Sequence, residues 1–145
     1  MTEPPPSIRA GEAPDLQTFL ADRIYEFNAA ATGFHDGESF SSTCTNETGA
    51  IRAGIYGYTW GGCCYVSYLW VHESDRGKGF GAALLRAAEG HARSRRCAVV
   101  FVATHSFQAP AFYAHLGYAQ QALVRDHPLG HASMILAKRL SSPIA

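Results

Sequence analysis

With 145 residues, of which 47% are apolar and 17% charged, the chain has the composition of one ordinary globular domain. No apolar run approaches the roughly 20 residues that a membrane-spanning helix needs, so we expect no membrane partner. The N-terminal stretch MTEPPPSIRAGEAP lacks the basic region and hydrophobic core of a signal peptide, which predicts a cytoplasmic protein.

The charges are unevenly distributed, although 12 acidic and 12 basic side chains cancel overall. Up to residue 75 there are ten acidic and three basic side chains, and from Arg76 onward nine basic and two acidic ones. One interpretation is a basic half that holds an anion and an acidic half that attracts a cation. The alternative is that folding mixes the two halves and the asymmetry disappears.

In the first half of the chain, residues 1–12 are either a Pro-rich tail or a short first strand. A helix is predicted from Asp15 to Ala30, because apolar side chains recur there at i, i+3, i+4 spacing and Pro14 suits the first turn. Residues 38–71 then form three β-rich runs separated by the turns NETG and WGGC. This pattern predicts an antiparallel three-stranded meander.

The second half alternates helices and strands. We predict a helix over 82–96, a strand covered on both faces over 97–104, and a short helix that begins at Pro110. Two final strands, YAQQALVR and HASMILAKRL, are joined by DHPLG. The predicted fold is a single α/β (α+β) domain over residues 14–140, with a mixed, mostly antiparallel sheet flanked by helices. Residues 1–13 are expected to be weakly ordered and residues 141–145 to form a tail.

The stretch LWVHESDRGKGFGAALL, residues 69–85, places three glycines and two cations between a strand and a helix. Successive backbone N–H groups at a helix start bind anions, and glycine lets the backbone approach a pyrophosphate closely. A nucleotide-binding P-loop is excluded, because Lys78 is followed by Gly79 and not by Ser or Thr. A dinucleotide fold needs an acidic residue on the next strand, and none occurs between His91 and Arg125.

Two motifs together resemble the GNAT superfamily of acyl-CoA-dependent N-acetyltransferases over residues 14–140. Arg76 to Gly81 fits [QR]-x-x-G-x-G, and the later FYAHLGY fits the helix-to-strand signature F-Y-x-x-L-G-[YF]. The resemblance implies acetyl-CoA as co-substrate and a sheet whose central strands splay apart to admit its pantetheine arm. No metal is implied. The four cysteines, none of them in a C-x-x-C pair, are expected to be reduced and structural.

The resemblance also implies how acetyl-CoA is held. Backbone groups of Leu69, Trp70 and Val71 would contact the thioester carbonyl and the pantetheine amides, with an N–H near Leu69 or Trp70 as the oxyanion donor. Ser106 stands where family members commonly have asparagine, and it would bind the pantetheine or an ordered water. The pyrophosphate would be held by Arg76, Gly77, Lys78, Gly79, Phe80, Gly81 and Ala82.

The catalytic acid is implied to be Tyr113, the tyrosine of the F-Y pair, which would protonate the departing thiolate. The identity of the base is left open. Several family members carry a glutamate where this chain has Tyr65, and a neutral phenol is a poor base. Tyr65 can instead position a water, and Glu26 or His105 can accept the proton.

Each alternative base has a structural interpretation as well. By strand alternation Tyr65 would share a face with Ser67 and Leu69, which fits a packed core residue. Glu26 fits a solvated helix face. Because the expected glutamate is missing at position 65, a non-catalytic CoA-binding or sensory module of the same fold is the alternative function.

The predicted reaction is transfer of the acetyl group from acetyl-CoA to a primary amine in a ternary complex, since no cysteine has the setting of a nucleophile. The acceptor is a small molecule or a peptide or protein amine, and the acidic first half favours a cationic one. Nucleic acid is not expected, because the basic residues coincide with the coenzyme site. Family members are often dimers, so a homodimer is a further expectation.

Overall fold

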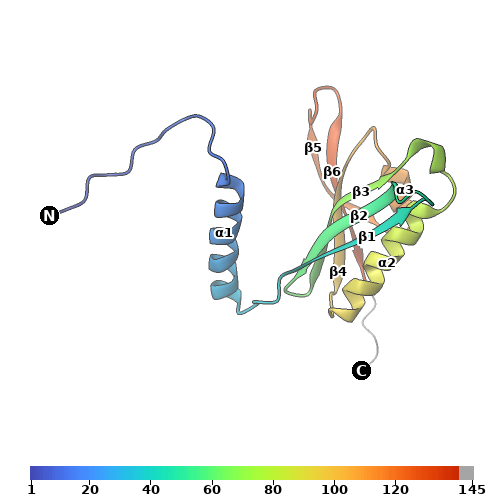
Figure 1. Cartoon of the computed structure of the whole chain (residues 1–145), viewed down its shortest axis with the longest axis horizontal. Coiled ribbons are helices and arrows are strands. Elements are labelled where there is room, and N and C mark those ends of the chain that lie inside the picture. Colours follow the sequence, from blue (N-terminus) through green and yellow to red (C-terminus); the bar gives the residue numbers. More distant parts are fainter. Residues whose placement is uncertain (141–145) are drawn as a thin grey trace. The chain divides into compact units, whose positions relative to one another are not determined.

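The computed structural model describes residues 1–140, so the predicted tail at 141–145 lies outside the described residues. The chain divides into two compact units, residues 1–34 and the part from residue 35 onward (Figure 1). Within residues 1–140, no helix combines the length and the apolar character needed to cross a membrane.

The first unit contains a single helix, α1, Leu16–Thr32. Residues 1–13 form neither helix nor strand, so the alternative of a short first strand is wrong, and the weakly ordered tail stays a prediction. Gly33 ends the helix in a left-handed conformation, and its N–H donates to the carbonyl of Ala29 at 2.8 Å. The helix therefore begins one residue later and ends two residues later than its periodicity predicts.

The second unit is built on a mixed six-stranded sheet with the strand order β1-β2-β3-β4-β6-β5. Among the strands of residues 35–140, only the β3–β4 pair is parallel, and all other neighbours are antiparallel. The α/β (α+β) prediction is confirmed. The strands are β1 (Glu38–Thr45), β2 (Ile51–Trp60), β3 (Cys63–Val71), β4 (Val99–His105), β5 (Ala119–Arg125) and β6 (Ala132–Arg139), and the helices are η1 (Glu73–Asp75), α2 (Phe80–Ser94) and α3 (Pro110–His115).

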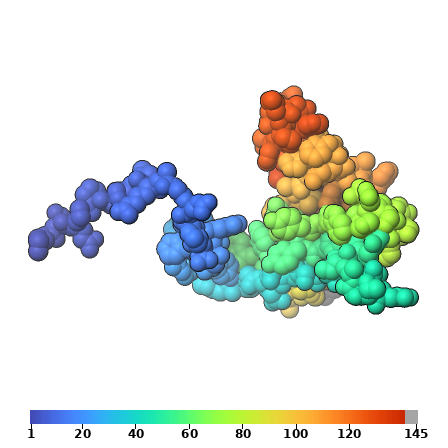
Figure 2. Space-filling view, turned by 45° about the horizontal axis from the view of Figure 1, so that its top comes forward, coloured from blue at the N-terminus to red at the C-terminus, as the bar shows by residue number. Residues whose placement is uncertain are grey.

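The predicted meander over residues 38–71 is confirmed as β1, β2 and β3. The turn NETG closes around Asn46, whose Oδ1 accepts from the backbone N–H groups of Thr48 (3.1 Å) and Ala50 (2.9 Å). This side chain replaces backbone partners that the turn cannot supply, as asparagine commonly does in turns. The last two strands form a hairpin that projects from the rest of the second unit (Figure 2).

The core lies between one face of the sheet and α2, which crosses that face (Figure 1). On α2 the buried stripe repeats at helical spacing, as an Ala/Leu helix covering a sheet requires. The sheet contributes every second residue of β2 and β4, as expected from strand alternation. The central members of the core are Ala53, Ile55, Cys64, Val66, Leu84, Leu85, Ala88, Ala92, Val100, Val102, Tyr113 and Leu136.

The sheet forks between β3 and β4. These strands pair only where Cys63–Val66 lies beside Val99–Val102. Beyond this point β3 continues beside β2 alone, and β4 continues beside β6 alone. The fork begins at a β-bulge, because Tyr56 is paired with Tyr68 while Gly57 is paired with Val66, so that Ser67 is the extra residue. The predicted splaying of the central strands is confirmed.

The bulge reverses which side chains of β3 face the core. Tyr65 is paired with Tyr58, which is exposed, whereas Leu69 is paired with the buried Ile55. Since Tyr58 and Ile55 lie on opposite faces of β2, Tyr65 and Leu69 lie on opposite faces of β3. The expectation that Tyr65 shares a face with Leu69 is therefore wrong, because one inserted residue shifts the alternation by one.

Candidate active site at the fork of the sheet

The glycine loop leads from β3 through η1 into α2. Gly77 and Gly79 have φ angles of 77° and 89°, a left-handed conformation that residues with a side chain rarely adopt. Helix α2 begins at Phe80, two residues earlier than predicted, and its N-cap Gly79 provides no side chain to cap it. The N–H groups of residues 79–82 therefore have no intrahelical partner, and together with the helix dipole they favour an anion at this position.

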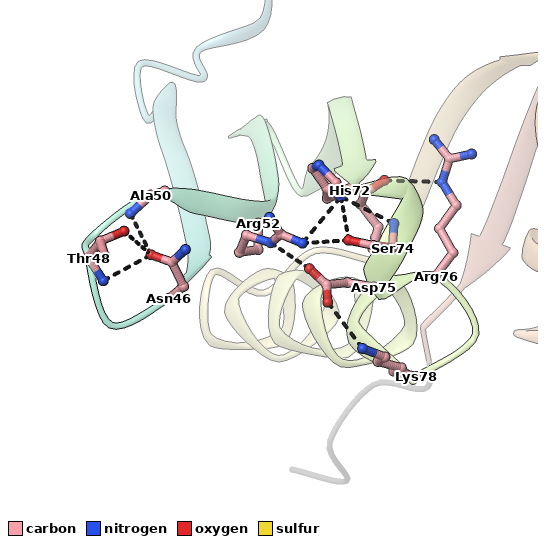
Figure 3. A network of polar contacts seen from close by, with 10 residues as sticks. Asn46, Thr48, Ala50, Arg52, His72, Ser74, Asp75, Arg76 and Lys78 are labelled. Carbon is pink, nitrogen blue, oxygen red and sulfur yellow. Dashed lines mark hydrogen bonds and ion pairs between the residues drawn. The ribbon is translucent and has the colours of Figure 1, made fainter.

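A polar network fixes the loop to the neighbouring strand β2 (Figure 3). The Nε of Arg52 donates to Asp75 at 2.7 Å, and its Nη2 donates to Ser74 Oγ at 2.6 Å. His72 Nδ1 accepts from the Ser74 N–H at 3.1 Å. The hydrogen bond from Arg52 holds the pKa of the Asp75 carboxyl below its usual value. The start of the loop is thus held in one conformation by side chains that sequence motifs did not identify.

Two cations predicted to hold the pyrophosphate lie on this loop. Arg76 Nε donates to the Val71 carbonyl at 3.1 Å, and the end of its guanidinium group points away from the network (Figure 3). Lys78 is exposed and its Nζ lies 3.3 Å from Asp75 Oδ1. Because an exposed ion pair of this kind contributes little, the Lys78 ammonium group is available to a stronger anion.

The walls of the fork contain the residues predicted to contact the thioester and the pantetheine arm. Leu69, Trp70 and Val71 lie on β3 beyond its last pair with β4, so they are paired with β2 alone. Ser106 follows β4 and exchanges two hydrogen bonds with Ala132, since its N–H donates to the Ala132 carbonyl (2.8 Å) and its Oγ accepts from the Ala132 N–H (3.0 Å). The structure therefore places these four residues on both arms of the fork.

Tyr113 is buried on α3, within the core cluster on the α2 side of the sheet. Its ring makes edge contacts with Phe112 and Tyr118, at centroid distances of 5.1 and 5.8 Å. Burial raises the pKa of Tyr113 to about 12, because the phenolate would be poorly solvated there. The phenol therefore keeps its proton at neutral pH and can act as a donor.

A buried ionic network lies behind Tyr113. Glu89 on α2 is 4% exposed, and its carboxylate lies 2.8 Å from Lys138 Nζ on β6 and accepts from the Tyr118 hydroxyl at 3.1 Å. Burial and the Glu89 charge raise the pKa of Tyr118. Sequence reasoning missed this network, although Glu89 stands four residues after Leu85 on the buried stripe of α2.

The proposed bases lie in different places. Tyr65 is paired before the fork, and its ring lies between those of Tyr58 (5.5 Å) and Phe101 (4.6 Å). Glu26 lies on α1 in the first unit, where its carboxylate pairs with Arg23 at 2.6 Å. His105 is the last residue of β4 and bonds through Nδ1 to the His127 carbonyl at 2.9 Å.

A cavity of about 450 Å³ opens beside the end of β4. Ser106 lines it together with residues of the β5–β6 hairpin, among them Arg125, Asp126 and His131. Its volume suits a small molecule, and its lining offers both an acidic and a basic side chain. Within residues 1–140, no group of three or more His, Cys, Asp or Glu side chains is arranged to hold a metal ion.

Comparison with known proteins gives a consistent result. The model of the acetyltransferase (GNAT) family matches residues 8–118. A blasticidin-S acetyltransferase from Streptomyces morookaense is 36% identical over 104 residues, which cover 71% of this chain and 76% of the relative. The crystal structure of an acetyltransferase from Bacillus cereus superposes with a TM-score of 0.80 at 30% identity, covering 92% of this chain and 98% of the other.

A more distant structure adds information about the ligand. A Bacillus anthracis protein described as a streptothricin acetyltransferase was crystallised in complex with acetyl coenzyme A. It superposes with a TM-score of 0.63 at 14% identity and covers 71% of this chain and 63% of its own. At this identity the likeness shows a common fold, and the same fold therefore accommodates acetyl-CoA in another protein.

Proposed function

The chain belongs to the GNAT family of acetyltransferases, and we propose that it transfers an acetyl group from acetyl-CoA directly to a primary amine. The observation that carries this proposal is the fork, which opens after Val66 and Val102 and adjoins the uncapped start of α2. A forked sheet exposes backbone N–H and C=O groups on the inner edges of its arms. An extended pantetheine arm can bind these groups as an added strand does.

Acetyl-CoA would be held by main-chain and cationic groups. The N–H groups at the start of α2, with Arg76 and Lys78 beside them, provide the charge and geometry for a pyrophosphate. The edge of Leu69, Trp70 and Val71 that is not paired with β4 would provide partners for the pantetheine amides, and an N–H near Leu69 or Trp70 would stabilise the oxyanion.

The reaction needs two proton transfers. The amine nitrogen must lose a proton as its lone pair forms the C–N bond to the thioester carbon, and the C–S bond then breaks to release a thiolate. We assign the second transfer to Tyr113, whose phenol holds its proton at neutral pH and would donate it to the thiolate sulfur. Acetylated amine and CoA-SH are the products.

The acceptor is proposed to be a small cationic amine bound in the cavity beside Ser106. The Asp126 carboxylate at its wall would attract an ammonium group, and the cavity volume of about 450 Å³ is large enough for a compact molecule. The similarity to a blasticidin-S acetyltransferase supports a small-molecule amine as the acceptor class.

The alternative is a non-catalytic CoA-binding or sensory module. It is favoured by the position of Tyr65, which packs between two rings before the fork where several family members carry a glutamate base. A sensor would bind acetyl-CoA without releasing CoA-SH in the presence of any amine, whereas an enzyme would release it.

The first test is calorimetric titration of the purified protein with acetyl-CoA, with NAD and ATP as controls. We expect binding of acetyl-CoA alone. Thiol release is then measured with a panel of amines that includes blasticidin S and a lysine peptide. Tyr113→Phe should lower kcat while leaving acetyl-CoA affinity nearly unchanged. Equal rates for Tyr113→Phe and wild type with every amine would refute the role of Tyr113.

A further inference from the structure

The end of β4 lies level with the predicted oxyanion donor across the fork. Val66 and Val102 are the last paired residues of the two central strands. His105 lies three residues beyond Val102 and Leu69 lies three residues beyond Val66. Because Ser67 is the bulge residue, Leu69 lies only two residue steps past Val66 along the sheet, and Trp70 lies three. At about 3.3 Å per residue, Leu69 lies roughly 7 Å and both Trp70 and His105 lie roughly 10 Å past the opening of the fork. A thioester bound at the backbone of Leu69 or Trp70 would therefore lie near the level of His105.

His105 lies on the face of the sheet opposite to the catalytic acid. On β4, Val100, Val102 and Thr104 are buried, so by alternation His105 is directed to the other face. Tyr113 belongs to the core cluster on the α2 side. An amine that approaches from one face of the sheet would meet His105. The thiolate that leaves toward the other face would meet Tyr113.

The imidazole of His105 is held in the orientation that a base requires. Its Nδ1 lies 2.9 Å from the His127 carbonyl oxygen, which can only accept, so Nδ1 is the donor, and in the neutral imidazole the lone pair lies on Nε2. The ring is stacked on Phe107 with an interplanar angle of 2° and meets the His127 ring edge-on at 5.0 Å. A base whose second nitrogen is bonded to an orienting group is the arrangement that proton transfer in enzymes commonly uses.

We propose that His105 is the general base of this enzyme, accepting the proton of the acceptor amine at Nε2. The assignment rests on the proposed acetyl transfer. The proton passes from the amine nitrogen to Nε2 while the C–N bond forms and the C–S bond breaks. The thiolate takes its proton from Tyr113, and both side chains exchange with solvent to restore their starting states. Tyr65, packed between rings before the fork, then has a structural role.

The kinetic test compares His105→Ala with His115→Gln, a control that removes an exposed histidine from the last turn of α3. Thiol release is measured with acetyl-CoA and the panel amine that the wild type acetylates fastest. We expect kcat of His105→Ala to fall by about 10²- to 10⁴-fold while the KM for acetyl-CoA stays near the wild-type value. Added imidazole should restore part of the rate to His105→Ala and leave His115→Gln unaffected. A structural defect would not be rescued in this way.

A second measurement needs only the wild-type protein. Long-range ¹H–¹⁵N spectra of histidine-labelled protein, with His105 assigned through His105→Gln, should show the tautomer protonated at Nδ1 and a shift on addition of acetyl-CoA. A wild-type rate in His105→Ala, or a proton on Nε2 in the free protein, would overturn the assignment and leave acetyl transfer intact. No acetyl-CoA binding by the wild type would overturn both proposals.

Discussion

Gly57 allows the close strand contact at which the fork begins, and its replacement by alanine tests the origin of the fork. A Cβ built on Gly57 would lie 2.1 Å from the Tyr65 carbonyl oxygen and 2.8 Å from Phe40 Cζ. The Phe40 ring can rotate, but the carbonyl belongs to the backbone of β3. The two strands must therefore separate by about 1 Å to restore contact distance. Overpacking costs about 1–3 kcal/mol in protein cores. We expect Gly57→Ala to lower the free energy of unfolding by about 3 kcal/mol, at the upper end of this range, because the backbone of β3 has to move.

A matched control is available on the same strand. A Cβ on Gly54 would meet the Ser42 carbonyl at 3.6 Å and Thr43 Cγ2 at 3.8 Å, which is ordinary contact. Urea unfolding followed by tryptophan fluorescence, from Trp60 and Trp70 in the sheet, gives the free energy of unfolding of both variants. The free energy of unfolding of Gly54→Ala should remain close to that of the wild type, while that of Gly57→Ala should fall by about 3 kcal/mol. Equal stabilities would refute the claim that the Gly57 contact sets the position of β3.

Three further changes test the packing around the site by urea unfolding. Gly90→Ala should stabilise the protein by about 0.5–1 kcal/mol, since a Cβ within α2 would meet nothing within 4 Å. Glu89→Leu should lower the free energy of unfolding by about 3–5 kcal/mol, because it leaves the Lys138 ammonium unpaired. Adding Lys138→Met should recover most of this loss. No recovery in the double variant would contradict the ion-pair explanation. The pKa of Tyr113 rises to about 12 on folding from about 10 in unfolded chains. The protonated phenol therefore stabilises the folded state fully below pH 10, and this contribution to the free energy of unfolding is lost as the pH rises to 12. Tyr113→Phe should therefore reduce the loss of stability over this interval by about 2–3 kcal/mol, and an unchanged pH dependence would show that Tyr113 titrates normally.

The elements of the fold were predictable because each has a local signal. The meander followed from two short turns between β-rich runs, and the NETG turn is indeed held by the Asn46 side chain. The short helix from Pro110 and the final hairpin around DHPLG were placed by proline and glycine. The observed boundaries differ from the predicted ones by one or two residues, as at the start of α2. A sequence motif does not show at which residue the backbone hydrogen bonds of a helix begin.

The arrangement of side chains at the site was less predictable, because it depends on pairing between distant segments. Nothing in CYVSYLWV indicates that Ser67 is a bulge residue, so the face of Tyr65 was predicted wrongly. The bond from Arg52 to Asp75 joins residues 23 positions apart, and no motif contains both. The predicted roles of the loop, of Tyr113 and of Glu26 stay predictions until binding and turnover are measured.

The fork also has a consequence for the order of folding. The half-sheet of residues 38–71 and the half-sheet of residues 99–139 are each continuous in sequence, and each can form through short-range hairpins or neighbouring strands. Their four-residue parallel junction is a crossover contact that requires α2 to be in place, and such long-range contacts form slowly. We therefore expect the contact that joins the two arms to be among the last to form. A ligand that bridges both arms should slow their separation. Acetyl-CoA would then stabilise the folded state as well as serve as a substrate.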